Sequence, residues 1–587
     1  MKVQFTILLL IMLWLTKKIT SLPPESRVLD RSDFPDDFVF GTATSAFQIE
    51  GSTAEGGKSP SIWDHFSHTF PERTRMQNGD VAADFYHQYK DDIKLMRELN
   101  MDAFRFSISW ARLIPSGKVK DGVNKEGVQF YLALIDELLA NGIQPSVTLY
   151  HWDHPQALED EYGGFLNPQI IEDFRNYARV CFENFGEKVK MWTTINEPYV
   201  ISVAGYETGN KAVGRCSKWV NSKCPGGDSA TEPYIVSHHL LLSHAAAVQE
   251  FRNCNKTLYD GKIGIVVSPW WLEPHDMTSP TDKEAIERGL VLELDWHLDP
   301  IFYGEYPEIM KKRVGNRLPS FTAEESKMLL NSSDFIGINF YGAHFVAHLS
   351  HIDPSRRRFK TDQHFEKKVL NHSNHKIGPG DDLGIIRSYP VGLRKVLNYI
   401  KDKYNNPIVY IKENGIDEYD DGTKSREEIL KDTLRISYHR DYLEQLHKAI
   451  IDDGCDVRGY YTWSLLDNFE WEHGYSIRFG LYYVDYNDLK RYPKDSVNWF
   501  KQFLKRPVAK SEEIENEEAR NVSSQEENNN KTLDDSEGSE TSIDYIVNLM
   551  MKNGSRLEDE ERDFCALENR NDQLGLVLVE TTNSVGF

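Results

Sequence analysis

The chain has 587 residues, of which 40% are hydrophobic and 12% aromatic, so it is long and apolar enough to bury a substantial core. Its net charge is −23, but residues 511–587 alone carry 20 acidic and 6 basic side chains. The remaining body is mildly acidic, which argues against nucleic acid or an anionic membrane surface as a partner, because neither would be attracted to it.

The first residues have the pattern of a secretory signal peptide. Lys2 precedes the apolar run 5–15, and small polar residues follow at Thr20 and Ser21. The run is too short to span a bilayer comfortably, so we expect residues 1–21 to be removed and the mature protein to follow the secretory pathway without a membrane anchor. A buried N-terminal helix is the alternative. The final compartment, extracellular, vacuolar or derived from the ER, stays open.

The cysteines fit an exported protein. There are six, and Cys216 and Cys224 enclose a short loop that one disulfide could close in an oxidising compartment. No Cys-x-x-Cys motif suggests zinc. N-glycans are possible at six Asn-x-Ser/Thr triplets, which begin at Asn255, Asn331, Asn371, Asn521, Asn530 and Asn553.

Eight β-rich runs alternate with longer amphipathic segments between residues 35 and 505. The runs are 38–44, 103–109, 145–152, 192–196, 262–268, 335–341, 408–412 and 457–466. Two of the intervening segments, 128–140 and 170–185, have helical periodicity. The alternation predicts an α/β fold, a (β/α)8 TIM barrel with insertions in its βα loops, over residues 22–507. A doubly wound sheet would alternate too, but no glycine-rich phosphate loop follows the first run.

The last segment, residues 508–587, has a different composition. Residues 511–540 hold eleven acidic and two basic side chains and few apolar ones. Such a stretch cannot bury enough surface to offset the entropy of ordering it, so we expect an acidic, largely disordered C-terminal extension. A sorting or docking element is the alternative to a tolerated extension.

Polar residues follow several of the predicted strands. His151 follows the third run, Glu197 the fourth and Glu413 the seventh, while Asn339 and Tyr341 lie at the sixth. Because a barrel carries its active site at the carboxyl ends of its strands, we expect these side chains to share one mouth.

Two of these residues, Glu197 and Glu413, suit the hydrolysis of a glycosidic bond. One carboxyl group must donate a proton to the leaving oxygen, and in retaining enzymes the other attacks the anomeric carbon. The donor needs a raised pKa, from an apolar surround or a neighbouring carboxylate. The nucleophile must stay ionised, and Arg105 is a candidate charge partner. Either glutamate alone could instead be a surface residue at a helix N-terminus.

Six motifs surround these residues along the chain. They are Phe-Arg-Phe-Ser-Ile-Ser-Trp (104–110), Tyr-His-Trp-Asp (150–153), Thr-Ile-Asn-Glu-Pro (194–198), Gly-Ile-Asn-Phe-Tyr (337–341), Lys-Glu-Asn-Gly (412–415) and Trp-Ser-Leu-Leu-Asp-Asn-Phe-Glu-Trp (463–471). With these motifs the sequence resembles glycoside hydrolase family 1, the β-glucosidase family, and especially its plant, crucifer-type members, which are related to myrosinases. The resemblance covers about residues 34–504.

The resemblance implies a retaining β-glucosidase that removes terminal β-D-glucosyl residues from small-molecule glucosides through a covalent glucosyl-enzyme intermediate. Glu197 would be the acid/base and Glu413 the nucleophile. Two carboxylates and water suffice, so no cofactor or metal is expected. The implied substrate-binding residues are Gln48, His151, Asn196, Glu470 and Trp471, with Trp463 as the floor, Tyr341 on the nucleophile and Phe479 at the aglycone channel.

Two positions, Lys412 and Ile385, depart from the family pattern, and Arg387 lies near the second. Lys412 replaces the usual Thr before Glu413, and strand alternation would point its side chain away from Glu413, so we expect little effect on catalysis. Ile385 stands where many plant relatives carry a Trp platform for flat aglycones. Arg387 nearby could meet an anion, or could be a solvated loop residue.

The aglycone therefore stays open, as does the oligomeric state, for which a homodimer is one possibility. A glucosinolate-cleaving thioglucosidase, or atypical myrosinase, is an alternative, although classical myrosinases carry Gln where this chain has Glu197. A transglucosidase would use the same intermediate with an alcohol acceptor. A catalytically inactive sugar-binding module would typically lack one catalytic glutamate, whereas both are present here.

Overall fold

The computed structural model describes residues 29–254 and 260–506. Several expectations fall outside these ranges. They concern the signal peptide 1–21, the extension 508–587, Cys565 and the triplets at Asn255, Asn521, Asn530 and Asn553. Of the other two triplets, Asn331 is exposed and Asn371 is half-buried.

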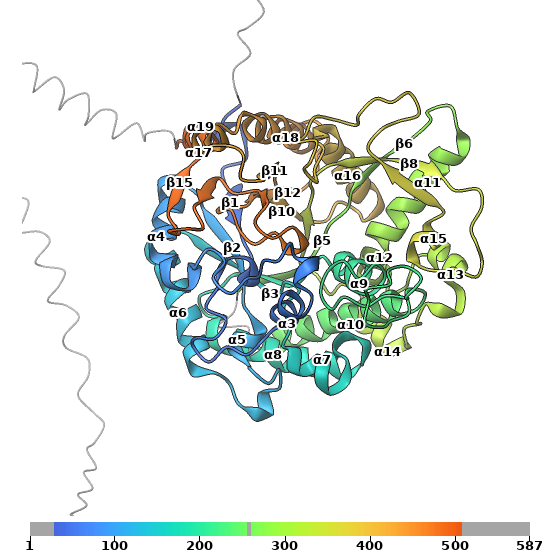
Figure 1. Ribbon diagram of the computed structural model, residues 1–587, viewed down its shortest axis with the longest axis horizontal. Helices are drawn as coiled ribbons and strands as arrows, with labels where there is room; N and C mark the ends of the chain where they lie inside the picture. Colours follow the sequence, from blue (N-terminus) through green and yellow to red (C-terminus); the bar gives the residue numbers. More distant parts are fainter. Residues whose placement is uncertain (1–28, 255–259, 507–587) are drawn as a thin grey trace, which may run out of the picture. The chain divides into compact units, whose positions relative to one another are not determined.

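Eight parallel strands close into a barrel, in the order β1-β12-β10-β7-β5-β4-β3-β2 (Figure 1). The strands are β1 (Val39–Ala43), β2 (Ala103–Ser107), β3 (Gln144–Tyr150), β4 (Met191–Asn196), β5 (Lys262–Val267), β7 (Phe335–Asn339), β10 (Val409–Asn414) and β12 (Val457–Trp463). Each of the eight predicted runs is one of these strands, and the predicted (β/α)8 class is confirmed.

Amphipathic helices surround the strands (Figure 1). Both helices predicted from periodicity are present, as α6 (Lys125–Ala140) and α8 (Gln169–Phe185). In α8, residues such as Ile170, Phe174 and Tyr177 are buried and recur at the spacing of one helix face. The other long helices are α4 (Phe85–Glu98), α10 (Glu232–Asn253), α16 (Pro390–Lys403) and α18 (Thr433–Ile451).

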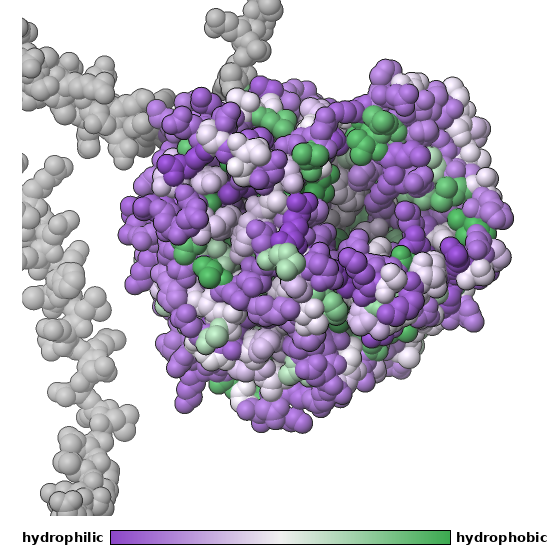
Figure 2. All heavy atoms as spheres, viewed as in Figure 1, coloured by the Kyte–Doolittle hydropathy of each residue, from purple (hydrophilic) through white to green (hydrophobic). Residues whose placement is uncertain are grey.

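Shorter helices fill the connections. They include α3 (Ile62–Thr69), α7 (Gln156–Tyr162), α9 (Pro198–Tyr206), α11 (Pro280–Leu290), α12 (Trp296–Tyr303), α13 (Glu308–Val314), α15 (Phe359–Gln363) and α19 (Asp495–Phe503). Among the described residues, no helix combines the length and apolar character needed to cross a membrane. The face drawn in Figure 2 is mostly hydrophilic, with small separate apolar patches.

Insertions follow the carboxyl ends of barrel strands, as predicted. The insertions after β5 and β7 together form a three-stranded sheet of β6 (Trp271–Pro274), β8 (Ala343–His348) and β9 (Phe365–Lys368). Short strands also follow β10 and β12. After β10 comes β11 (Glu418–Tyr419), which pairs with β13 (Ile477–Arg478) after β12. Further along, β14 (Tyr482–Val484) pairs with β15 (Arg491–Pro493). These insertions build the walls around the barrel mouth.

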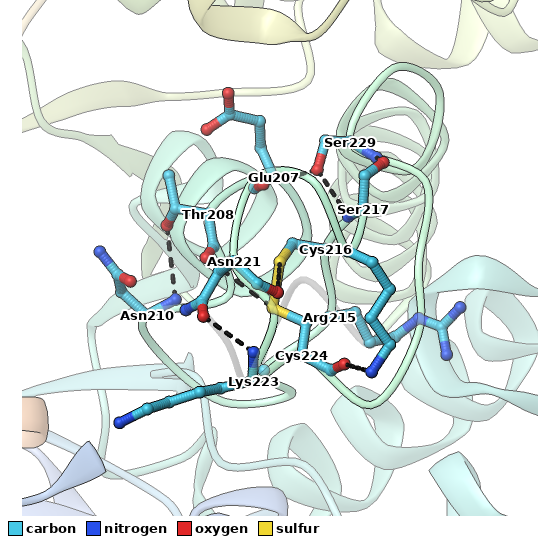
Figure 3. The surroundings of a disulfide bond; sticks show 12 residues. Glu207, Thr208, Asn210, Arg215, Cys216, Ser217, Asn221, Lys223, Cys224 and Ser229 are labelled. Carbon is cyan, nitrogen blue, oxygen red and sulfur yellow. Dashed lines mark hydrogen bonds between the residues drawn. A yellow bond between two sulfur atoms is a disulfide. The ribbon is translucent and has the colours of Figure 1, made fainter. Parts of the chain in front are cut away.

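Cys216 and Cys224 form the predicted disulfide, in the loop between α9 and α10 (Figure 3). The Ser217 N–H donates to Ser229 Oγ, and this hydroxyl donates to the carbonyl oxygen of Glu207 (both bonds 2.7–2.9 Å). Both ends of the loop are therefore tied to its base. The remaining described cysteines, Cys181, Cys254 and Cys455, are free thiols.

Candidate active site

Glu197 and Glu413 line one cavity of about 210 Å³ at the mouth of the barrel. Glu197 directly follows β4, and Glu413 lies near the end of β10. The other lining residues are His151, Trp152, Val200, Lys211, Ser268, Trp270, Tyr341, Ile385, Ile386, Trp463, Glu470, Trp471, Glu472, His473 and Phe479. A larger hollow of about 610 Å³, beside α3 and α7, holds neither glutamate.

Glu197 is placed by a sharp change of direction at the strand end. Its backbone is left-handed, with φ 49°, and Pro198 begins α9 immediately afterwards. The Glu197 N–H donates to the Val266 carbonyl at 2.9 Å, which continues the pairing of β4 with β5 by one residue. Its carboxylate Oε1 accepts from Asn339 Nδ2 at 2.6 Å.

Glu413 sits between a cation and a phenol. Arg105 Nη1 donates to Glu413 Oε1, and this ion pair is buried. Tyr341 donates to Glu413 Oε2 at 2.5 Å. After Glu413 the chain passes close to the backbone of Trp463. A Cβ atom at Gly415 would lie only 1.9 Å from the Trp463 carbonyl oxygen. This close approach requires glycine.

A chain of hydrogen bonds links the two glutamates behind the cavity. Arg105 Nη2 donates to Asn196 Oδ1 at 2.6 Å, and Asn339 Nδ2 donates to the same oxygen at 3.0 Å as well as to Glu197. Arg105 therefore serves Glu413 directly, whereas Glu197 receives only the neutral amide of Asn339.

This difference gives the two carboxyl groups different electrostatic surroundings. Burial, and then repulsion from Glu413, raise the pKa of Glu197 to about 8, while the Asn339 hydrogen bond and Arg105 oppose the shift. Near neutral pH, Glu197 therefore keeps a proton that it can donate. Glu413 has a guanidinium partner for its negative charge.

The polar residues assigned to the sugar lie partly on the wall and partly behind it. Glu470 lines the cavity, and burial is the main cause that raises its pKa to about 8. Gln48 is buried and donates from Nε2 to Asn468 Oδ1 (2.9 Å), the Phe469 carbonyl (3.1 Å) and Glu470 Oε2 (3.3 Å). Gln48 thus positions Glu470, and Asn196 has the same relation to His151, since Asn196 Nδ2 contacts His151 Nε2 at 3.0 Å.

Aromatic rings form the floor and one side. The ring of His151 stacks on Trp463 and on Trp471, each with a centroid distance of 6.0 Å. Burial, and then Arg105, lower the pKa of His151 well below its ordinary value, so the ring is neutral. On the outer side Phe479 packs edge-on against Tyr341 at 5.9 Å.

Several wall residues were missed in the sequence because loops bring them in. Lys211 comes from the segment that leads to the disulfide, and its Nζ donates to Glu472 Oε2 at 2.5 Å. The same amino group lies 5.4 Å from the ring centroid of Trp152 and 5.9 Å from that of Trp471. Trp270 follows β5, so a search for aromatic residues after each predicted strand would have found it.

The two aglycone-side residues singled out in the sequence behave differently. Ile385 lines the cavity. Arg387 does not: it is buried, and its Nη1 donates to the Asp381 carbonyl at 2.5 Å while Nη2 approaches Asp382 Oδ1 at 3.4 Å. Its guanidinium group is occupied by its own loop, so the anion-meeting role considered for Arg387 has no support in this geometry.

Lys412, beside the nucleophile, lies inside the barrel. Its Nζ donates to Ser146 Oγ on β3 at 3.0 Å, and β3 stands opposite β10 in the closed strand order. Its amino group lies within 5.2 Å of three ring centroids, those of Phe335, Tyr410 and Tyr461. Regular alternation does not describe this part of β10, because its pairing with β7 shifts between Ile411 and Glu413.

The amino group of Lys412 has no carboxylate partner among the described residues. Burial, and then repulsion from Arg105, lower the pKa of Lys412 well below its ordinary value. Within residues 29–254 and 260–506, no group of three or more His, Cys, Asp or Glu side chains is placed to hold a metal ion.

The barrel mouth holds two buried carboxyl groups, one beside a guanidinium group and one with a raised pKa. This arrangement on a closed (β/α)8 barrel is that of a glycoside hydrolase. The sequence profile of Glycosyl hydrolase family 1 matches residues 30–508, and the chain belongs to this family. Two Arabidopsis thaliana proteins, Beta-glucosidase 29 and Beta-glucosidase 28, are 78% and 74% identical to it, and each match spans 100% of this chain and at least 99% of the relative.

Solved structures agree. A Glu-to-Gln mutant of a rice β-glucosidase, in a covalent complex with Glc from GA4GE, has a TM-score of 0.80 at 47% identity, covering 81% of this chain and 100% of that chain. An aphid myrosinase has a TM-score of 0.72 at 38% identity, covering 80% and 98%. The protein is thus a retaining β-glucosidase that acts on O-glycosyl bonds.

The hydrogen bond from Asn339 should set the alkaline limit of activity. Because it stabilises the ionised form of Glu197, the Asn339→Ala variant should hold the Glu197 proton to higher pH. We expect the basic limb of the kcat/KM profile, near pH 8 in the wild type, to move up by about one unit for an alkyl glucoside, whose poor leaving group needs the proton. An unchanged limb, or a shift to lower pH, would contradict this assignment.

Lys412→Met should stabilise the protein. A depressed folded-state pKa means that protonation of Lys412 costs stability as the pH falls below the unfolded value of about 10.4. The gain in Tm should therefore be larger at pH 6 than at pH 9.5. Lys494 is the control: burial lowers its pKa too, but it pairs with Asp467 at 2.8 Å, so Lys494→Met removes a partner of a buried carboxylate and should lower Tm. A Tm below that of the wild type at both pH values would contradict the prediction that protonated Lys412 destabilises the fold.

Proposed function

We propose that Glu413 is the nucleophile and Glu197 the acid/base of this β-glucosidase. The observation that carries the assignment is the position of Arg105, which pairs with Glu413 and leaves Glu197 without a cation in contact. A nucleophile must be ionised and an acid must hold its proton, so the two environments match the two roles.

The reaction then proceeds in two displacements. Glu413 attacks the anomeric carbon while Glu197 transfers its proton to the glycosidic oxygen, and the aglycone leaves as an alcohol. Glu197, now ionised, takes a proton from water, which attacks the same carbon and releases glucose with its original configuration. The hydrogen bond from Tyr341 holds the free Glu413 carboxylate in one orientation before the first step.

The glucosyl ring would lie on Trp463, with its hydroxyls directed at the polar wall. Carboxylate and imidazole groups of Glu470 and His151 can bond hydroxyls, and an indole face suits the apolar side of a sugar ring. Gln48 and Asn196 support this wall from behind. Their hydrogen bonds to Glu470 and His151 are compatible with further contacts to a bound sugar.

Alanine variants with added azide test the two roles separately. Glu197→Ala should still form the glucosyl-enzyme from a nitrophenyl β-glucoside, since this leaving group needs little acid assistance, and azide should then attack from the opposite face to give a β-glucosyl azide. In Glu413→Ala, azide should replace the missing nucleophile and give an α-glucosyl azide. Without azide both variants should lose at least about 100-fold in turnover. Product configuration by NMR is the measurement.

Glu284→Ala, an exposed glutamate on α11, is the matched control and should behave as the wild type. Full activity in Glu413→Ala, or the same azide configuration from both variants, would overturn the assignment.

An anionic aglycone, as in a glucosinolate, is a second candidate substrate. Lys211 is the cation on the cavity wall, and it stands beside Trp152 and Trp471 at the outer side of the sugar pocket. Glu472 already accepts from this amino group, so an anionic group would share it. Arg387, bound to its own loop, would not take part.

Substitution of Lys211 should separate anionic from neutral substrates. Lys211→Met should raise KM for a glucosinolate at least about tenfold, because it removes a charge-assisted contact, and change KM for a neutral aryl glucoside much less. Arg387→Gln, as the control, should leave the ratio of the two KM values unchanged. Absence of glucosinolate turnover by the wild type, or equal effects of Lys211→Met on both substrates, would remove this candidate.

We also propose that the protein follows the secretory pathway. The buried disulfide between Cys216 and Cys224 supports this route, because disulfides persist in oxidising compartments. One relative, 51% identical over 81% of this chain and 85% of its own, is named Beta-glucosidase 26, peroxisomal, in Arabidopsis thaliana. Localisation of a fluorescent fusion with and without residues 1–21 distinguishes the two destinations.

A further inference from the structure

Four basic side chains lie together in the insertions that follow β5 and β7, outside the active site. Arg288 comes from α11, Arg313 from α13, His348 from the end of β8, and His364 from the residue after α15. These elements gather at one edge of the molecule in Figure 1. None of the four residues lines the active-site cavity.

Neutral groups are the nearest acceptors for both arginines. Arg288 is largely buried; its Nη2 contacts His348 Nδ1 at 3.0 Å, and its Nε donates to the Gln363 carbonyl at 3.5 Å. Arg313 Nη1 donates to the Asp362 carbonyl at 3.1 Å. Because His348 Nδ1 accepts from a guanidinium group, its ring proton must be on Nε2, which remains a donor.

The carboxylates around this cluster are already engaged. Asp362 accepts from both Nη atoms of Arg317 at 2.7 and 2.9 Å and from the Tyr234 hydroxyl at 2.6 Å. Asp282 accepts two backbone N–H groups, at 2.8 and 3.0 Å. Glu284 is 70% exposed and reaches only 4.0 Å from Arg288.

Neither Arg288 nor Arg313 therefore has a carboxylate within hydrogen-bond distance in the described part of the chain. In the described part of the chain, Arg313 makes no ion pair with a carboxylate. Burial, and then repulsion from Arg313, lower the pKa of Arg288, and burial followed by the same two arginines lowers the pKa of His364. Like charges held together in a partly desolvated place destabilise a fold unless an anion neutralises them.

We propose that Arg288, Arg313 and His348 bind a tetrahedral oxyanion of the sulfate or phosphate class. Two guanidinium groups offer forked sets of N–H donors that match the oxygens of such an anion, and His348 Nε2–H adds a neutral donor. The anion would supply the direct ionic contact that the carboxylates of Asp362 and Asp282 do not make with these arginines. The site is independent of the sugar chemistry, since it shares no residue with the catalytic cavity.

Calorimetric titration of the full chain tests the proposal. Sodium sulfate and sodium phosphate are each added at constant ionic strength, and the wild type should bind one anion. Arg313→Gln should weaken that affinity at least about tenfold, because it removes a charged donor. Lys312→Gln is the matched control, because Lys312 is exposed on the same helix, and it should keep the wild-type affinity within about twofold. Aryl glucoside hydrolysis should be the same in all three proteins.

Thermal unfolding separates a binding site from a purely structural role. Without the anion, Arg313→Gln should not lower Tm, because the substitution removes a repulsion. Millimolar sulfate should raise Tm of the wild type more than that of the variant; only this difference counts, because sulfate also stabilises proteins generally. The proposal is overturned if the wild type binds neither anion, or if Arg313→Gln binds sulfate or phosphate as tightly as the wild type.

Discussion

The buried ion pair between Arg105 and Glu413 is the interaction on which the rest of the site depends. Glu413 is only 3% exposed and Arg105 is fully buried, so neither charge could be kept there without the other. The pair joins β2 to β10, two strands that are not neighbours in the barrel. The pair therefore forms only where the closed barrel brings β2 and β10 to the same mouth.

Burial and the neighbouring Glu413, rather than the guanidinium group, raise the pKa of the second carboxyl group, and Arg105 opposes this rise without contacting Glu197 directly. The remaining nitrogens of Arg105 go to the neutral groups Asn196 Oδ1 and Thr148 Oγ1, so no direct cation contact is left for Glu197. Burial and repulsion from Glu413 make a negative charge on Glu197 unfavourable. The two glutamates therefore differ in their surroundings, because one contacts a guanidinium group and the other contacts a neutral amide.

The sequence was sufficient for the barrel and for the residues at its strand ends. Strand periodicity and β-rich composition located all eight strands, because each is a short apolar segment between helices. The positions of Glu197, Asn339 and Glu413 followed from where those strands stop. Resemblance to a family, rather than periodicity, indicated that Tyr341 contacts the nucleophile, and that contact is present.

What the sequence did not reveal depends on irregular backbone and on loops. Alternation along β10 fails at Lys412 because one extra residue enters the pairing with β7, and no residue pattern marks that bulge. Arg387 looked free in the sequence, whereas Asp381 and Asp382 in the same loop hold its guanidinium group. Lys211 reaches the cavity through a long loop whose course depends on tertiary contacts.

These differences follow the division of the cavity into a sugar side and an aglycone side. On the sugar side, Gln48 and Asn196 are buried and bonded to the wall, so a substitution there leaves an unpaired polar group and costs stability. On the aglycone side, Lys211, Trp270 and Ile385 come from loops after different strands. Such loops tolerate changes in sequence that the buried network does not. Changes in these loops can therefore alter the outer cavity while the barrel keeps its glucosidase chemistry.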